Sequence, residues 1–163
     1  MADNNGVVLD MQSALGKFGR VLALRMKPNT DVLLGLTEGC RRAGITNGVI
    51  VSAIGSLKDV TFCDIWERDS EAGCAYGAPL KLPGPIELTS ASGIICHDDS
   101  GEINLHVHIS LSDRYGNAYG GHLLEGTKVQ VTVDAVIAEI DGVVMGRKYD
   151  PVLDFVLFSP KQA

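Results

Sequence analysis

The sequence lacks the cysteine pairs that mark disulfide-rich secreted domains, zinc fingers and thiol redox motifs. Its four cysteines, Cys40, Cys63, Cys74 and Cys96, include no Cys-x-x-Cys pair. The first residues, MADNNGVVLD, do not have the basic segment and long apolar segment of a secretory signal. We therefore expect a cytoplasmic protein with reduced thiols.

Long apolar runs are also missing, and positive charge is scarce. No run approaches the roughly 20 apolar residues that a membrane-spanning helix needs. The 14 Lys and Arg residues are outnumbered by 20 Asp and Glu residues, which gives a net charge of −6. Because protein–DNA affinity comes largely from cations that neutralise phosphates, this balance disfavours DNA as a partner. It does not exclude DNA, since an oligomer can gather basic residues on one face.

Motifs for phosphate binding and for a nucleophilic serine are absent as well. The sequence contains no Gly-x-Gly-x-x-Gly, no Gly-x-x-x-x-Gly-Lys-Ser/Thr and no Gly-x-Ser-x-Gly pattern. A length of 163 residues with 45% hydrophobic residues suits one globular domain. We expect residues 1–15 to form an N-terminal extension and residues 16–160 to form a single domain.

The hydrophobic pattern predicts several strands and one main helix. Asn29 or Thr30 is a suitable N-cap for the helix, Asp31 suits its first turn, and Gly44 is a suitable end. Turns are expected at residues 55–59, at residues 97–101 and at Asp141-Gly142, a dipeptide typical of type I′ hairpins. The composition of residues 68–79 predicts a long loop. The predicted strands cover residues 18–27, 48–54, 60–66, 86–90, 92–96, 104–112, 129–140, 143–147 and 152–158.

One of these strands has two histidines on a single face. His106 and His108 alternate with Leu105, Val107 and Ile109. Successive side chains of a strand point to opposite faces, so both imidazoles lie on the polar face, about 6.5–7 Å apart along the strand. Two imidazoles at that spacing can converge on one metal ion.

A third histidine follows a segment that is rich in turn residues. The sequence SDRYGNAYGG, which leads to His122, favours a chain reversal that returns His122 towards the first pair. Three imidazoles with one free position form an open site, which suits zinc or another divalent transition metal better than calcium or magnesium. The alternative is a solvated polar face with an ordinary turn histidine.

The segment PGPIELTSASGIICHDDSGEINLHVHISLSDRYGNAYGGHLLEG resembles the signature region of the PPC (plants and prokaryotes conserved) domain family. The similarity extends from about Gly19 to about Phe158 and includes LRMKPNTDVLLGL, VSAIGSL and Arg147. The resemblance implies an α+β fold, with a central, largely antiparallel sheet, one helix packed on it, and assembly into homotrimers. It also implies a metal, most often zinc, at His106, His108 and His122.

Two further residues are candidates for chemistry at such a metal. Glu87, a characteristic position of the family, is a candidate for orienting a ligand, accepting a hydrogen bond beside the ion or serving as general base, and Arg147 is a candidate for holding a carboxylate ligand near the metal. The alternatives are a strand-edge or interface hydrogen-bond acceptor for Glu87 and an internal ion pair for Arg147.

Two main classes of function follow from these observations, beside a third in which the chain is a structural or regulatory assembly module and the metal only stiffens the fold. The first is a trimeric metal-binding protein that binds a small molecule or performs metal-assisted catalysis. The second is the family's usual catalogue description, a DNA-binding or transcription-associated protein. Plant members add a short basic AT-hook to this domain, and no such segment is found in this sequence.

Overall fold

The computed structural model of the protein describes residues 10–163. Of the predicted N-terminal extension, residues 1–9 lie outside this range, and residues 10–16 have no regular secondary structure. The described part of the chain contains no helix with the length and apolarity needed to cross a bilayer. The elements are β1 (Lys17–Met26), α1 (Val32–Ala43), β2 (Gly48–Cys63), β3 (Ile65–Glu67), β4 (Cys74–Tyr76), β5 (Leu80–His97), β6 (Ile103–Ser112), β7 (Ala118–Leu123), β8 (Lys128–Asp141), β9 (Val143–Asp150) and β10 (Phe155–Gln162).

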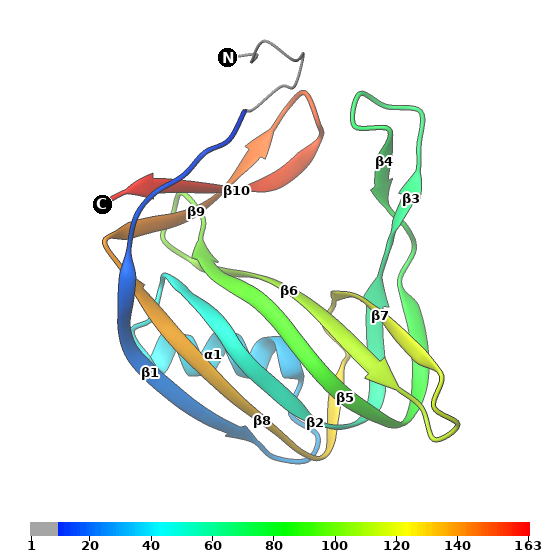
Figure 1. Cartoon of the computed structure of the whole chain (residues 1–163). Coiled ribbons are helices and arrows are strands. Elements are labelled where there is room, and N and C mark those ends of the chain that lie inside the picture. Colours follow the sequence, from blue (N-terminus) through cyan, green and yellow to red (C-terminus); the bar gives the residue numbers. More distant parts are fainter. Residues whose placement is uncertain (1–9) are drawn as a thin grey trace.

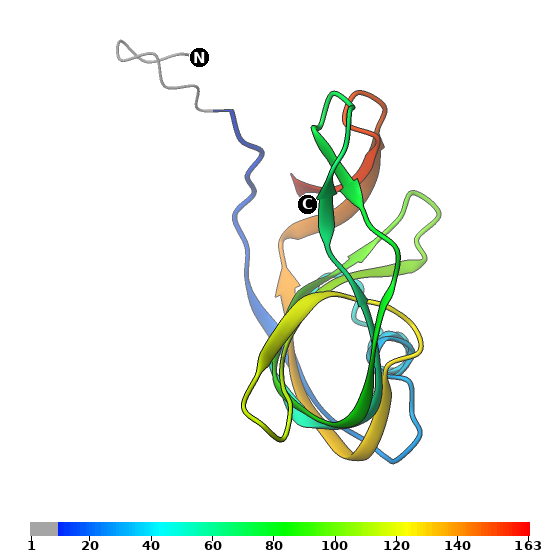
Figure 2. The same cartoon turned by 90° about the vertical axis from the view of Figure 1, so that its right-hand side faces the viewer.

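The strands form one large curved sheet and a small separate hairpin (Figure 1). The eight-stranded sheet has the order β1-β8-β2-β7-β6-β5-β9-β10, and β3 pairs with β4. Pairing is antiparallel except for one parallel contact between β5 and β9, at His97 and Gly146. Because β2 also pairs with β5, the strands β2, β7, β6 and β5 close into a ring, which Figure 2 shows end-on. This is the predicted α+β architecture.

Helix α1 is capped by Asp31 at its N-terminus and ended by Gly44 at its C-terminus. The Asp31 side chain accepts a hydrogen bond from the Leu34 backbone N–H at 3.1 Å. Gly44, with φ of 65°, adopts the left-handed conformation that commonly ends a helix. The prediction that Asn29 or Thr30 is the N-cap was wrong. Asn29 itself has a φ of 70° and turns the chain, so the helix starts only after Asp31.

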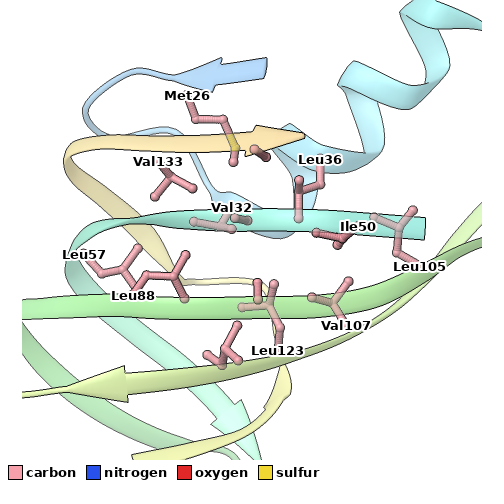
Figure 3. Packing of buried hydrophobic residues seen from close by; sticks show 14 of the residues in the cluster. Met26, Val32, Leu36, Ile50, Leu57, Leu88, Leu105, Val107, Leu123 and Val133 are labelled. Atoms are coloured by element: carbon pink, nitrogen blue, oxygen red, sulfur yellow. The ribbon is translucent and has the colours of Figure 1, made fainter. Parts of the chain in front are cut away.

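The core lies between α1 and the inner face of the curved sheet (Figure 3). Val32, Leu36 and Cys40 form the buried stripe of the helix. The helix approaches β1 closely because it presents glycines there. A Cβ atom at Gly35 would lie 2.6 Å from the sulfur of Met26, and one at Gly39 would lie 2.9 Å from Leu24 Cδ2.

Two predicted turns are absent. Residues 55–59 continue β2, which accommodates register shifts against its neighbours in this stretch and does not reverse. Asp141-Gly142 does not form a hairpin, because β8 already pairs with β1 on one side and β2 on the other. The chain therefore leaves β8 and enters β9, which pairs along its length with β10.

A bidentate ion pair between Arg20 and Glu139 joins β1 to β8, and Arg20 also binds the C-terminal end of α1. Arg20 donates from Nε to Glu139 Oε2 at 2.8 Å and from Nη2 to Glu139 Oε1 at 2.7 Å. Its Nη1 also donates to the carbonyl oxygen of Ala43 at 2.9 Å. The hydrogen bond from Arg20 is the main reason why the pKa of Glu139 falls to about 2 from 4.5.

This ion pair predicts a pH-dependent contribution to stability. A depressed pKa means that ionised Glu139 stabilises the folded protein above about pH 4.5, and that this contribution is lost as the pH falls towards 2. We expect Glu139→Gln to lower the urea midpoint of unfolding near neutral pH, modestly because Arg20 is largely exposed. The difference in urea midpoint between Glu139→Gln and the wild type should become smaller as the pH falls towards 3. A difference that is constant over this range would contradict the role given to Glu139.

Candidate metal centre

Strand β6 places two of the three histidines on the outer face of the sheet. Leu105, Val107 and Ile109 are buried in the core that contains α1. His106 and His108 alternate with them and therefore point away from that core. The sequence prediction for this strand is confirmed.

The third histidine returns through a tight turn that is organised by one carboxylate. Asp113 Oδ1 accepts hydrogen bonds from the backbone N–H groups of Tyr115 and Asn117, at 2.8 and 2.9 Å. Its Oδ2 accepts from the side chains of Asn117 and Tyr119. The chain then reverses into β7, where His122 lies directly opposite His108 in the antiparallel register.

The three imidazoles form one cluster. The ring centroids lie 5.0 Å apart for His106 and His108, 5.1 Å for His106 and His122, and 5.4 Å for His108 and His122. One ring nitrogen from each residue lies within 4.8 Å of the others, and the two Nε2 atoms of β6 are 3.0 Å apart. Nitrogens bound to one tetrahedral zinc ion are separated by about 3.3 Å, as follows from Zn–N bonds of about 2.0–2.1 Å. Small side-chain rotations would therefore bring all three onto one ion.

The surroundings of the cluster lower the pKa of two of its imidazoles, His106 and His122. Burial is the main cause that lowers the pKa of His122 to about 4, and positive charge at His106, His108 and Arg147 lowers it further. Burial, followed by the charge of Arg147, also lowers the pKa of His106. A neutral imidazole has the free lone pair that a metal ion requires. The residues present therefore fit a transition-metal ion in both geometry and donor type.

A tyrosine that the sequence did not single out also contacts the cluster. The hydroxyl oxygen of Tyr76, on β4, lies 3.4 Å from Nδ1 of His122, and the two ring centroids are 4.9 Å apart. We expected a loop over residues 68–79, but part of it pairs with β3, with Tyr76 opposite Ile65. A three-residue strand offers too short an alternation to be recognised from the sequence.

Arg147 lies beside the histidines. Its Nη1 donates to Asn104 Oδ1 at 2.9 Å and to the carbonyl oxygen of Leu105 at 3.4 Å, and its Nη2 donates to the carbonyl oxygen of Val156 at 2.8 Å. Its Nε is buried and finds no acceptor among residues 10–163. The guanidinium and His106 line the same cavity. The structure thus brings this predicted residue to the cluster, where it makes no internal ion pair among the described residues.

Glu87 and His97 lie apart from the three histidines. Glu87 pairs across the sheet with Ser112, which is four residues beyond His108 and hence about 13 Å farther along β6. Nδ1 of His97 lies 3.1 Å from the carbonyl oxygen of Asp98, at the β5–β6 turn. Neither side chain belongs to the histidine cluster.

The sequence profile of the Plants and Prokaryotes Conserved (PCC) domain matches residues 13–141, which include all three histidines. The chain belongs to this family. PCC and PPC abbreviate the same family name, and the predicted membership is confirmed. The matched segment ends before β9, so Arg147 and the β9–β10 hairpin lie beyond it.

Solved structures support the PPC fold. A PPC protein from Pyrococcus horikoshii is 25% identical, with a TM-score of 0.76 over 94% of this chain and 100% of that chain. A metal-containing protein from Archaeoglobus fulgidus is 24% identical, with a TM-score of 0.77 over 91% of this chain and 99% of that chain. A protein from Bacteroides thetaiotaomicron, described as a candidate DNA-binding protein, is 19% identical, with a TM-score of 0.69 over 90% of this chain and 98% of that chain.

The curated relatives of this PPC domain are much longer proteins. A bifunctional protein GlmU from Synechococcus sp. (strain JA-3-3Ab) is 28% identical over 137 residues, which cover 84% of this chain. The chain spans about a fifth of the length of the two curated relatives it matches, both of which have this name.

Proposed function

We propose that this PPC protein is a homotrimer in which each chain binds one zinc ion, or another divalent transition metal ion, through His106, His108 and His122. The observation that supports the proposal is the convergence of three imidazoles, from two neighbouring strands, on one outward-facing point. The description of the Archaeoglobus fulgidus relative as metal-containing agrees with it.

Three protein ligands leave a position open for a small molecule, which is typical of catalytic sites and unlike closed structural ones. A bound ion of this kind supplies Lewis acidity and lowers the pKa of a water molecule. Tyr76 is placed to orient the ring of His122 through Nδ1. Arg147 is placed to hold a negatively charged group next to His106. Because Glu87 lies about 13 Å along the strand from His108, we assign it no role at the metal of its own chain.

The outer face of the sheet gives a physical reason for self-association. Val21, Val51, Ile54 and Val136 are exposed on the adjacent strands β1, β2 and β8, where they alternate with core residues. Strands β1, β8 and β2 are neighbours in the sheet, and exposed apolar side chains on one face of a sheet commonly mark an interaction surface. Packing of two further copies against it would remove these side chains from water, which is the arrangement that a homotrimer provides.

Native mass spectrometry of the untagged full chain tests both parts of the proposal. We expect a complex of three 17.3 kDa chains that retains about one transition-metal ion per chain. The ions should leave on treatment with a chelator and return on addition of zinc. A protein that holds no metal after incubation with zinc would refute the metal site, and a monomer would refute the trimer.

DNA binding is the alternative, supported by the description of the Bacteroides thetaiotaomicron relative. The net charge of −6 opposes it. A chain without metal that binds duplex DNA at low salt, with affinity that falls steeply as salt is added, would favour this alternative.

A further inference from the structure

A cavity of about 510 Å³ opens beside the histidine cluster. It lies between the β3–β4 hairpin and the β9–β10 hairpin, which rise from the same end of the sheet (Figure 1). This volume is within the range of about 300–1,000 Å³ that is typical of small-molecule sites. The cavity is therefore large enough for a ligand that reaches from solvent to His106.

The walls of this cavity are almost entirely apolar. Ile65 and Tyr76 contribute from one hairpin, and Leu153, Phe155 and Leu157 contribute from the other. Tyr76 and Phe155 are in edge-to-face contact across the cavity, with ring centroids 5.8 Å apart. These walls favour a ligand with an apolar body.

The polar end of the cavity is positively charged. Arg147 is the charged residue among the described residues that line it, and none of those residues is acidic. A divalent ion held by three neutral imidazoles would add further positive charge that no carboxylate of the cavity balances. The buried Nε of Arg147 also has no acceptor among residues 10–163. The positive charge of Arg147 and of the proposed ion therefore favours a ligand with an anionic group at this end of the cavity.

A carboxylate suits this end better than a phosphate. Phosphate sites usually combine several basic side chains with backbone N–H groups at a helix N-terminus or in a glycine-rich loop. Here one guanidinium lines the cavity, and both of its terminal nitrogens already donate to Asn104, Leu105 or Val156. A single planar negative group matches one guanidinium and one open metal position.

We propose that this cavity binds a small monocarboxylate with an aryl or branched apolar body, with the carboxylate held between Arg147 and the metal ion. The apolar body lies between the two hairpins, against Tyr76 and Phe155. The proposal rests on the proposed metal site, because the ion supplies the second contact to the carboxylate.

Isothermal titration calorimetry of the zinc-loaded full chain, which measures the affinity for each probe, tests the proposal. The probes are phenylacetate, 3-phenylpropanoate and 4-methylpentanoate, each compared with its neutral amide. We expect at least one acid to bind about tenfold or more tightly than its amide, because a charge-assisted hydrogen bond is lost in the amide. Equal binding of every acid and its amide, or no binding by any acid, would overturn the proposal.

Variants separate the roles of the charge and of the walls. Arg147→Gln should weaken acid binding by about tenfold or more. Lys148→Gln is the matched control, since its ammonium is on the surface, 3.1 Å from Asp99 Oδ1, and it should bind the acid as the wild type does. Ala72→Trp, which adds bulk to a lining position, should abolish acid binding and leave the zinc content unchanged. Equal losses in Arg147→Gln and Lys148→Gln would contradict the assignment.

The visible absorption spectrum of cobalt-substituted protein is a second readout. It distinguishes a loss of acid binding from misfolding, and it identifies which of the two proposals fails. In cobalt-substituted protein, the acid should alter the visible absorption spectrum of the wild type and of Lys148→Gln, but not that of Ala72→Trp. If the wild type holds no metal, the proposed function fails. If the wild type holds metal and no acid changes its visible spectrum, only the carboxylate proposal fails.

Discussion

Replacement of His122 by alanine is expected to reduce the metal content from about one ion per chain to a small fraction. The cluster has three imidazoles, and the loss of one leaves two donors from the same strand, His106 and His108. Loss of a group that only orients a ligand typically costs 10–100-fold in affinity, so loss of a ligand itself should cost more than about 100-fold. Titration of zinc against a chromophoric chelator measures this difference.

The fourth histidine provides the matched control. His97 lies at the β5–β6 turn, where Nδ1 is near the Asp98 carbonyl oxygen, outside the cluster. We expect His97→Ala to retain the zinc affinity of the wild type. Because His122 is on the outer face, the metal-free His122→Ala protein should also unfold at a urea concentration close to that of the metal-free wild type. Equal loss of zinc in the two variants would contradict the assigned ligand set.

Substitution of Gly93 by alanine is expected to damage both the fold and the site. Gly93 pairs with Val107, the residue between the two histidines of β6. A Cβ atom there would overlap the carbonyl oxygen of His106 and lie 2.9 Å from Val107 Cα. These are backbone atoms, so relief requires a shift of β6. We expect a loss of about 3 kcal/mol or more in the free energy of unfolding, at the upper end of overpacking costs, together with weaker zinc binding.

Gly146→Ala is the control for this substitution. Gly146 also lies in the sheet, but a Cβ atom there would be 3.5 Å from its nearest neighbour, the carbonyl oxygen of Ser159. That spacing is ordinary contact, and we expect urea unfolding and zinc affinity close to those of the wild type. A Gly93→Ala protein as stable as Gly146→Ala would show that β6 has more freedom than its pairing with β5 implies.

The parts of the site that were predictable from sequence depend on local patterns. Strict alternation from Asn104 to Ser112 determines which face holds the two histidines of β6. Turn chemistry centred on Asp113 and Gly116 determines that the chain reverses and returns His122. Each of these features is contained within a few consecutive residues, so one sequence suffices to identify it.

The parts that were missed depend on pairing between distant segments. The Asp141-Gly142 dipeptide has the chemistry of a hairpin, but both edges of β8 are occupied by β1 and β2, which the local sequence does not reveal. The contact of Tyr76 with His122 requires the β3–β4 hairpin to fold against β7, and the distance of Glu87 from the cluster depends on the β5–β6 register. These facts become visible only when the strand order is known.

In the proposed metal site, His106, His108 and His122 bind one metal ion. A crystal of the zinc-loaded protein, measured on both sides of the zinc absorption edge, tests it most directly. We expect one anomalous peak per chain, about 2.0–2.1 Å from one nitrogen of each of the three imidazoles. A zinc peak elsewhere, or three imidazoles that surround no peak, would contradict it.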